Sequence, residues 1–276
     1  MKPIYRIAAP SITMSLDRQA RELKAFGQDV INLTAGQVDL PIPQSAKDAV
    51  CDALDADLTR YVPATGSADL KAAVRARMGW HNGSILISAG AKPLLSAAIA
   101  CLAGPVDEVL LPTPCYTSYP EMIRLFGAVP VLVEGDPENR FTVSKAALEQ
   151  AVSPRAKALL FNNPVNPTGA VYQREELRAI VDFCIEHDLW IIADEVYGAF
   201  VYEDPFVSLY EFADARERLI LVNSASKTYA MAGLRLGYAV APDAVAEAIA
   251  GYISHTLGCP CSLSERAAIA ALRGNH

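Results

Sequence analysis

Short apolar segments alternate with helical stretches along most of this chain, and this alternation constrains the fold more than any other feature. Strands that alternate with helices predict an α/β fold with a mainly parallel sheet. Continuous apolar runs such as Leu189–Ala193 fit strands that are covered on both faces. The expected strands are Ile85–Ser88, Glu108–Leu111, Val129–Val133, Ala158–Phe161, Trp190–Ala193, Leu219–Asn223 and Gly237–Ala241. The expected helices between them are Lys92–Leu102, Tyr119–Phe126, Ser144–Ala151 and Arg174–His187.

The N-terminal part of the chain predicts further elements before this alternation begins. A short apolar strand is expected at Val30–Leu33, and a loop at Gly36–Pro43, where glycine and prolines are concentrated. No internal repeat or linker divides the sequence, so we expect one large α/β domain over residues 1–276. Helices are expected at Arg18–Phe26 with Gly27 as its end, at Ser45–Leu54 with Ser45 as a candidate cap, and at Ser67–Met78.

The composition limits the class of protein. Hydrophobic residues make up 52% and charged residues 20% of the 276 positions, values typical of a soluble globular chain. The formal net charge is −7, so there is no electrostatic reason to expect a nucleic acid partner. No apolar run reaches the ~18 residues of a membrane-spanning helix. Residues Met1–Arg6 lack the pattern of a signal peptide, so we expect a cytoplasmic protein.

The cysteines and histidines form no pattern typical of a metal site. The 6 cysteines are scattered, and Cys259 and Cys261 are the only close pair. The 4 histidines form no HExxH or other ligand pattern. We therefore expect free thiols, as in a reducing cytosol, and no metal.

Polar residues directly after the expected strands are the candidates for a binding site, because open α/β sheets bind ligands at the carboxyl ends of their strands. Ser88–Lys92 joins a strand to a helix through small residues, which would let an anion approach the free N–H groups of the helix. An ordinary βα turn is the alternative. Asn162–Gly169 follows a buried strand, and its prolines could fix Asn166 as a rigid amide donor, although the same residues also favour plain turns.

Charged groups follow the next two strands. Asp194 comes directly after an apolar strand, where an ionised carboxylate needs a partner unless the strand end is solvated. Lys227 follows another strand in a run of small residues, and Arg235 lies eight positions later. A lysine in such surroundings can have a lowered pKa and act as a nucleophile, whereas the alternative is a surface lysine in a serine-rich loop. An Asn, an Asp, a Lys and an Arg could thus converge on one anionic, heteroaromatic ligand.

These motifs resemble those of the class I/II aminotransferases, the fold-type I enzymes of the aspartate aminotransferase superfamily that use pyridoxal 5′-phosphate (PLP). The likeness runs from about Pro10 to about Leu272. It implies a three-layer α/β/α large domain with a mainly parallel seven-stranded sheet, PLP as cofactor, and an amino acid and a 2-oxo acid as substrates. The motifs that carry it are Asn166-Pro167-Thr168-Gly169, Asp194-Glu195-Val196-Tyr197, and Ser224-Ala225-Ser226-Lys227 followed by Arg235 and Gly237.

The resemblance implies roles for the residues around the cofactor ring. Lys227 would form the internal Schiff base with PLP and later carry the proton between Cα and C4′. Asp194 would pair with the pyridine nitrogen and keep it protonated. Asn166 and Tyr197 would hydrogen-bond the 3′ oxygen and tune the Schiff base. Tyr116 would stack on the ring face.

The same resemblance implies a phosphate site and a substrate site. Backbone N–H groups of three residues would cradle the phosphate, namely Gly90, Ala91 and Lys92. Ser224 and Arg235 would complete that site, with Arg235 as a charge-assisted donor. Tyr61 would reach the phosphate of a neighbouring subunit, which implies a homodimer. Gly36, together with Asn166, would lie near the substrate carboxylate.

The sequence departs from the family at its C-terminus. Family members continue past the point that matches Leu272 into a small domain, whose arginine binds the substrate α-carboxylate, and Arg266 and Arg273 lie too early to match it. Three interpretations follow: a fragment, a variant that binds substrate differently, or a catalytically silent PLP-binding protein. A C–S β-lyase shares the same large-domain motifs and remains a further alternative. A nicotinamide-binding α/β protein is disfavoured, because no GxGxxG follows an early strand.

Overall fold

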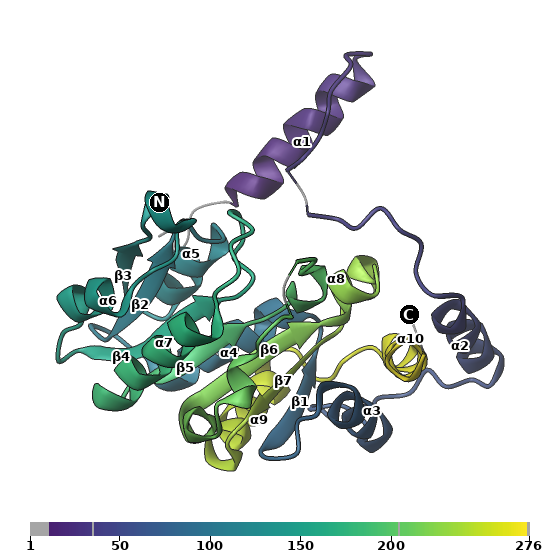
Figure 1. Cartoon of the computed structure of the whole chain (residues 1–276). Helices are drawn as coiled ribbons and strands as arrows, with labels where there is room; N and C mark the ends of the chain where they lie inside the picture. Colours follow the sequence, from purple (N-terminus) through teal and green to yellow (C-terminus); the bar gives the residue numbers. More distant parts are fainter. Residues whose placement is uncertain (1–10, 35, 204, 275–276) are drawn as a thin grey trace, which may run out of the picture.

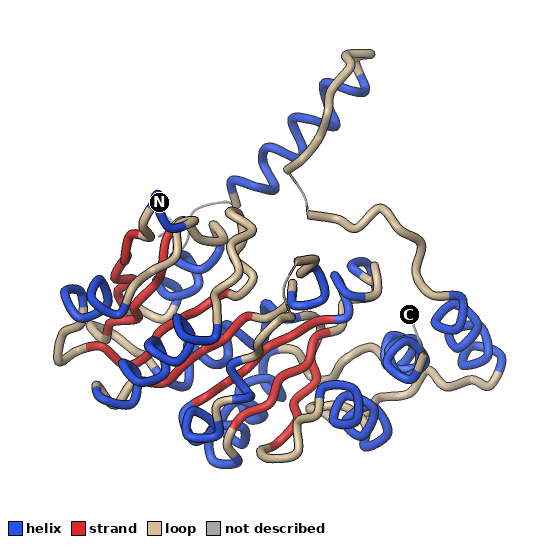
Figure 2. Tube along the Cα trace, viewed as in Figure 1, coloured by secondary structure: helices blue, strands red, loops and turns tan. Residues whose placement is uncertain are grey.

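Seven strands form one sheet in the computed structural model, which describes residues 11–34, 36–203 and 205–274. The sheet runs through the middle of the molecule (Figure 1 and, with strands in red, Figure 2). Its strand order is β1-β7-β6-β5-β4-β2-β3. All seven strands expected in the alternating part of the sequence are present. Their bounds are β1 Ser84–Ser88, β2 Glu108–Thr113, β3 Val129–Glu134, β4 Ala156–Asn162, β5 Trp190–Asp194, β6 Leu219–Ser224 and β7 Gly237–Ala241.

The sheet is mainly parallel, as expected, with one reversed strand. Strands β3, β2, β4, β5 and β6 pair in parallel. Strand β7 lies antiparallel between β6 and β1. Because β7 runs in the opposite direction, its first residue, Gly237, lies opposite the last residues of its neighbours, Ser88 of β1 and Ser224 of β6. The start of β7 therefore belongs to the same edge of the sheet as the ends of the other strands.

Helices cover both faces of the sheet, which gives the expected three layers and explains the continuous apolar runs in the strands. One core lies between the sheet and three helices, and Leu94, Ile123 and Ile249 are among its buried residues. These helices are α4 (Ala91–Leu102), α5 (Ser118–Leu125) and α9 (Asp243–Thr256). The other core contains Leu70, Leu148, Leu177 and Ala267. Its helices are α3 (Ala68–Met78), α6 (Lys145–Ala151), α7 (Arg174–Glu186) and α10 (Ser262–Arg273), and α2 (Gln44–Asp55) packs against α10.

Short helical segments lie in several of the loops between the strands. Helix α8 (Ala225–Thr228) comes directly after β6. The remaining short segments are 3-10 helices. They are η1 (Pro137–Asn139), η2 (Gly198–Phe200), η3 (Leu209–Glu211), η4 (Ala213–Arg218) and η5 (Ala232–Leu234).

Two local predictions at the N-terminal side were wrong. Val30–Leu33 forms no strand, and Ile31 and Leu33 are 85% and 88% exposed, because no other strand lies beside this segment to pair with it. Ser45 does not cap α2, because the helix already begins at Gln44 and its N-cap is Pro43. The expected loop at 36–43 and the end of the first helix before Gly27 were confirmed.

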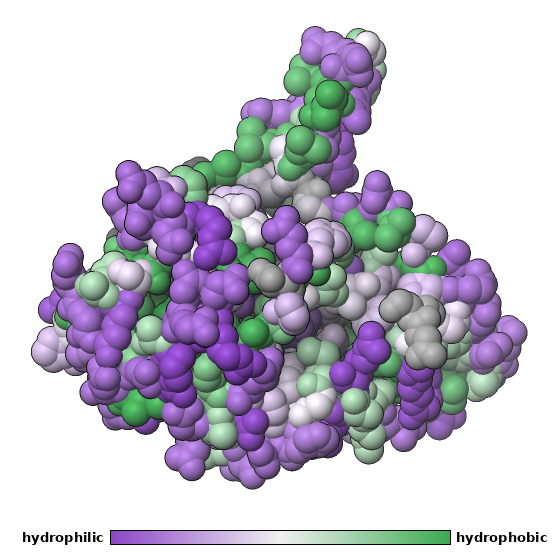
Figure 3. Space-filling model, viewed as in Figure 1, coloured by the Kyte–Doolittle hydropathy of each residue, from purple (hydrophilic) through white to green (hydrophobic). Residues whose placement is uncertain are grey.

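Helix α1 (Ile12–Ala25) begins six residues earlier than expected, because Ser11 caps it by accepting a hydrogen bond from the backbone N–H of Met14. The helix projects away from the body (purple in Figure 1), and apolar residues gather on the side seen in Figure 3. The exposed apolar residues of this helix and its C-cap are Ile12, Met14, Leu16, Leu23 and Phe26. None of the helices in the described part of the chain is long and apolar enough to cross a membrane.

Candidate active site

The candidate residues meet at the edge of the sheet where β1, β4, β5 and β6 end and β7 begins. Asp194 is the last residue of β5, and Lys227 lies in α8, directly after β6. Asn166 follows β4 on a loop bounded by prolines, and Gly90 follows β1. The parallel strand ends bring these residues together although they are separated by many positions in the sequence, as the sequence predicted.

A cradle suited to an anion lies at the N-terminus of α4. Gly90 is the N-cap residue at φ 102°, a conformation that favours glycine, and no side chain caps this helix end. The first N–H groups of α4 therefore lack the side-chain partner that a cap would supply. A Cβ on Gly237 would lie 2.6 Å from the carbonyl oxygen of Gly90, so only glycine lets the two segments approach this closely.

Arg235 supplies the charge of this cradle. Its Nη1 donates to the carbonyl of Ala232 at 2.9 Å and approaches the Ser226 hydroxyl at 3.5 Å. Its Nη2 lies 3.5 Å from the carbonyl of Ala89, in the loop that leads into α4. The guanidinium thus spans the loops before α4 and β7 and places a permanent positive charge beside the helix N-terminus, as a phosphate requires.

Ser224 contributes to the same edge from within the protein. Its hydroxyl is buried, donates to the carbonyl of Leu236 at 2.9 Å and accepts from the N–H of Ser226 at 3.0 Å. Ser224 thereby fixes the loop between β6 and β7, which carries both Lys227 and Arg235.

The carboxyl group of Asp194 is buried, with the residue 5% exposed. One oxygen accepts a hydrogen bond from the hydroxyl of Tyr119 at 2.8 Å, and the other accepts from the N–H of Val196 at 3.2 Å. Burial raises the pKa of Asp194 to about 6, while these hydrogen bonds and the charge of Lys227 act in the opposite direction. The sequence led us to expect partners for this carboxylate, and the structure supplies them in Tyr119, Val196 and Lys227.

Lys227 is half-buried beside Asp194. Burial lowers the pKa of its ammonium group, and the neighbouring Tyr116 and Asp194 oppose this shift. Its Nζ donates to the carbonyl of Gly36 and lies 5.5 Å from the centre of the Tyr197 ring. A Cβ built on Gly36 would lie 3.5 Å from this Nζ and 3.6 Å from the Tyr197 hydroxyl, so the three residues form one cluster.

Tyr116 and Lys92 border the cluster on the side of α5. The Nζ of Lys92 lies 5.2 Å from the centre of the Tyr116 ring and donates to the Ser118 hydroxyl at 3.2 Å. Burial would raise the pKa of Tyr116, but hydrogen bonds with Ser118 and Lys92 and the charges of Lys92 and Lys227 give a net lowering. Two ammonium groups, those of Lys92 and Lys227, are therefore close enough to act on the Tyr116 hydroxyl.

Asn166 is held in place by a second asparagine. Its backbone N–H donates to the side-chain oxygen of Asn162 at 2.7 Å, and the side-chain N–H of Asn162 donates to the carbonyl of Asp194 at 2.8 Å. Tyr61 is the one predicted site residue that the described chain leaves apart from this cluster. It is 97% exposed, on the segment before α3.

Sequence reasoning missed three residues that support the site. Tyr119 and Asn162 contact Asp194 directly. Glu195 is buried, and its two oxygens accept from the Ser208 hydroxyl at 2.7 Å and the Leu209 N–H at 2.8 Å. Their roles depend on tertiary contacts, which the local sequence does not specify.

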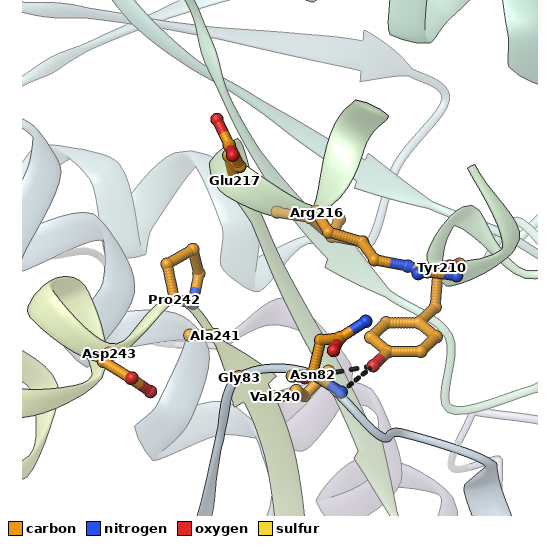
Figure 4. Close-up of a pocket in the computed structure, with 10 residues that line it drawn as sticks. Asn82, Gly83, Tyr210, Arg216, Glu217, Val240, Ala241, Pro242 and Asp243 are labelled. Atoms are coloured by element: carbon orange, nitrogen blue, oxygen red, sulfur yellow. Dashed lines mark hydrogen bonds between the residues drawn. The ribbon is translucent and has the colours of Figure 1, made fainter. Parts of the chain in front are cut away.

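A separate cavity of 220 Å³ lies at the opposite edge of the sheet, where β1 begins and β7 ends (Figure 4). Tyr210 lines it, and its hydroxyl accepts from the backbone N–H of Asn82 at 2.7 Å and donates to the carbonyl of Asn82 at 3.0 Å. Arg216 lies over the Tyr210 ring, 4.6 Å from its centre. This cavity shares no residue with the cluster around Lys227. Over the described ranges, no group of His, Cys, Asp and Glu residues is arranged to hold a metal ion.

The groups gathered at the sheet edge fit PLP part by part. The free N-terminus of α4 and Arg235 suit its phosphate, Asp194 suits a protonated ring nitrogen, and the amine of Lys227 suits its aldehyde. Together with the three-layer fold, these features define the large domain of a fold-type I, PLP-dependent enzyme.

Comparisons with known proteins give the family. The chain belongs to the class I and II aminotransferases, PLP-dependent transaminases, whose family model matches residues 28–276. It is 37% identical to an aspartate aminotransferase of Geobacillus stearothermophilus, with 99% of this chain and 72% of that protein aligned. It is 39% identical to a probable aspartate/prephenate aminotransferase of Aquifex aeolicus, over 96% of this chain and 69% of that protein.

The similarity extends to the three-dimensional structure. An aspartate aminotransferase from Thermus thermophilus with maleate superimposes with a TM-score of 0.94 at 35% identity. The match covers 99% of this chain and 73% of that one. The expected fold class, the aminotransferase family and the PLP dependence of that family are thereby confirmed.

Proposed function

We propose that this protein transfers an amino group from an amino acid to a 2-oxo acid, with Lys227 as the residue that bonds to PLP. One observation carries the proposal: the half-buried amine of Lys227 lies beside the buried carboxylate of Asp194, at the edge where an uncapped helix N-terminus offers a phosphate site. The similar proteins described above are aminotransferases, which supports transamination over the C–S β-lyase and the silent PLP-binding protein considered from the sequence.

Bound PLP withdraws electrons from the bonds at the substrate Cα, and the chain supplies the groups that direct this chemistry. Lys227 would hold the cofactor until substrate displaces its amine, and that amine would then take the proton from Cα. A lowered lysine pKa favours this role, because more of the amine is unprotonated near neutral pH. Asp194 would keep the ring nitrogen protonated, and this role requires its carboxylate to stay ionised.

Other residues would orient the cofactor. The N–H groups at Gly90, Ala91 and Lys92 and the guanidinium of Arg235 would bind the phosphate, and Ser224 would hold the surrounding loop. Tyr116 would pack on the ring, and Asn166 and Tyr197 would hydrogen-bond the ring oxygen.

Aspartate is the amino donor that we propose, since the similar proteins are named for aspartate. A dicarboxylic substrate carries a second negative charge, which the exposed ammonium of Lys92 beside Tyr116 would attract. Gly36 and Asn166 would contact the substrate carboxylate, because Gly36 lies within reach of Lys227.

We propose that residues 1–276 act as one domain of a cytoplasmic homodimer. The six cysteines are all free, which fits a reducing compartment. Tyr61 is almost fully exposed, as a residue that reaches the cofactor phosphate of a second subunit would be in a single chain. Light scattering during size-exclusion chromatography checks this, and a monomer with full PLP affinity would refute the role of Tyr61.

Borohydride trapping tests the function. The purified chain is mixed with PLP, the visible spectrum is recorded before and after reduction, and the labelled peptide is located by mass. We expect a visible band that reduction removes and a label on Lys227, with Lys227→Ala showing neither. Lys157→Ala is the control and should be labelled like the wild type.

Conversion by an amino acid is tested in a separate sample that has not been reduced. There, added aspartate should convert the visible band. A band without conversion by any amino acid would indicate a silent binder, and a label spread over other lysines would refute the site.

A further inference from the structure

Tyr119 connects two of the residues around the proposed cofactor site. It lies in α5, three residues after Tyr116, and is 2% exposed. Its hydroxyl donates to the carboxylate of Asp194 at 2.8 Å. Its ring packs edge-on against Tyr116, with ring centres 5.4 Å apart and an interplanar angle of 87°. One side chain therefore contacts both a charged group and an aromatic ring of the site.

The direction of this hydrogen bond is fixed by the two groups. Burial and the charge of Asp194 raise the pKa of Tyr119 well above its ordinary value, so the phenol keeps its proton and donates it. The Asp194 oxygens also accept the N–H of Val196. Two carboxylate oxygens offer about four acceptor positions, so the carboxylate can accept a further N–H donor.

The surroundings of Asp194 make this donor important for its charge. Four titratable groups influence Asp194 or are influenced by it: Lys227, Tyr119, Glu195 and Tyr197. Lys227 favours the ionised carboxylate through its charge, but its amine would be occupied by the cofactor. Tyr119 is then the side-chain donor that still stabilises the carboxylate against the effect of burial.

We propose that Tyr119 is a positioning residue that acts through Asp194: its hydroxyl keeps the carboxylate ionised and fixed in orientation, so that Asp194 can pair with a protonated ring nitrogen. This proposal rests on the proposed function, because the ring nitrogen belongs to PLP. The edge-on contact would at the same time fix the plane of the Tyr116 ring. Tyr119 itself need not touch the cofactor.

Replacement of the hydroxyl alone tests this role. In Tyr119→Phe the ring and its packing remain, while Asp194 loses its side-chain donor inside the protein. We expect PLP binding about tenfold to a hundredfold weaker, the range for losing a hydrogen bond to a charged group. We also expect the pH midpoint of the visible band of bound PLP to rise. This midpoint reports the protonation of the Lys227 nitrogen that is bonded to PLP. A ring nitrogen that is protonated less of the time places less positive charge near it.

Tyr172→Phe is the matched control. Tyr172 is equally buried, its hydroxyl accepts from the N–H of Val143 at 2.8 Å, and its ring packs on Phe161 rather than at the site. Both variants should lose some stability in urea. Only Tyr119→Phe should change PLP affinity and the midpoint of the band.

A double-mutant cycle decides whether Tyr119 acts through Asp194. PLP affinity is measured by titration for the wild type, Tyr119→Phe, Asp194→Asn and the double variant. In the Asp194→Asn background, we expect Tyr119→Phe to weaken PLP affinity by less than twofold. Full additivity, or a Tyr119→Phe variant with wild-type affinity and midpoint, would overturn the proposal. If Tyr119→Phe alone does not fold, the comparison of Asp194→Asn with the double variant still decides it. Absence of a trapped adduct in the wild type would instead overturn the proposed function, and this inference with it.

Discussion

The side-chain amide of Asn162 donates a hydrogen bond to the backbone carbonyl of Asp194 at 2.8 Å, and thereby joins the ends of β4 and β5. The oxygen of the same amide accepts the N–H of Asn166 at 2.7 Å. Both hydrogen-bonding sides of one buried side chain are thus used to hold two residues of the candidate site. A carboxylate or a hydrocarbon at position 162 can satisfy at most one of these two contacts.

Asn162→Asp should weaken both the fold and the site. The substituted carboxylate can still accept from Asn166, but it faces the carbonyl of Asp194 without a proton to donate. We expect a loss of about 1–3 kcal/mol in the free energy of unfolding, the cost of leaving a buried acceptor unsatisfied, and weaker PLP binding. Urea unfolding and PLP titration measure the two effects. Asn82→Ala replaces an exposed asparagine at the far edge of the sheet and should change neither. Wild-type values for Asn162→Asp would show that the bridge has no role.

Gly237→Ala should disrupt the phosphate cradle. The new methyl group would meet the backbone of Gly90 and Ala91, which cannot move as a flexible side chain could. We expect a loss of about 1–3 kcal/mol in stability, typical of overpacking, and a marked loss of PLP affinity. Gly233→Ala is the control, since a Cβ there meets no atom within 4 Å. Equal PLP affinities of the two variants would contradict the close approach of β7 to the α4 loop.

Glu195→Gln should make stability less dependent on pH. Burial raises the pKa of Glu195 from its ordinary value of 4.5 to about 8 in the folded protein. Between these values the folded state binds one more proton than the unfolded state, so stability falls as pH rises through this window and is unaffected by this group below it. We expect the urea midpoint of the wild type to fall more between pH 5 and 8 than that of Glu195→Gln. Glu217→Gln, at an exposed carboxyl, should behave like the wild type, and parallel curves for all three proteins would refute the prediction.

Lys227 should react with amine reagents at lower pH than surface lysines. Burial lowers its pKa, so its unprotonated fraction rises earlier as pH increases. Competitive acetylation of the PLP-free protein, read by peptide mass, gives the midpoint for each lysine. We expect the midpoint of Lys227 to lie below that of the exposed Lys47, and to fall further in Asp194→Asn, because the opposing carboxylate is removed. A midpoint equal to that of Lys47 would contradict the burial effect.

Most of the strands were predictable because they are covered on both faces and therefore leave continuous apolar runs in the sequence, although β3 keeps Val129 and Leu132 exposed. Val30–Leu33 shows the limit of that signal, since a run of four residues with three apolar side chains forms a strand only where another strand can pair with it. The reversed direction of β7 leaves no trace in hydrophobicity, because either direction buries the same side chains. Helix α9 was absent from the expected elements, although the spacing of Val245, Ile249 and Ile253 carries its period.

The residues proposed to face a ligand carry a clearer signal in the sequence than those that support them. Lys227 and Asp194 stand out because a charged residue directly after an apolar strand is chemically conspicuous. The contact between Tyr119 and Asp194 joins positions 75 residues apart and depends on how α5 lies over the sheet. Neither the local sequence of α5 nor that of β5 specifies this distance.

The pairing of β1 has a consequence for the order in which the chain can assemble. Strand β1 is the outermost strand on one side of the sheet, and it pairs with β7, which begins at Gly237. On the ribosome, β1 must therefore wait for about 150 further residues to be synthesised before its partner exists. The loop after β1 and the arginine before β7 form one cradle, so the anion site is among the last parts of the sheet to be completed. A nascent chain that has not yet emerged past β7 should consequently be unable to use PLP to stabilise its fold.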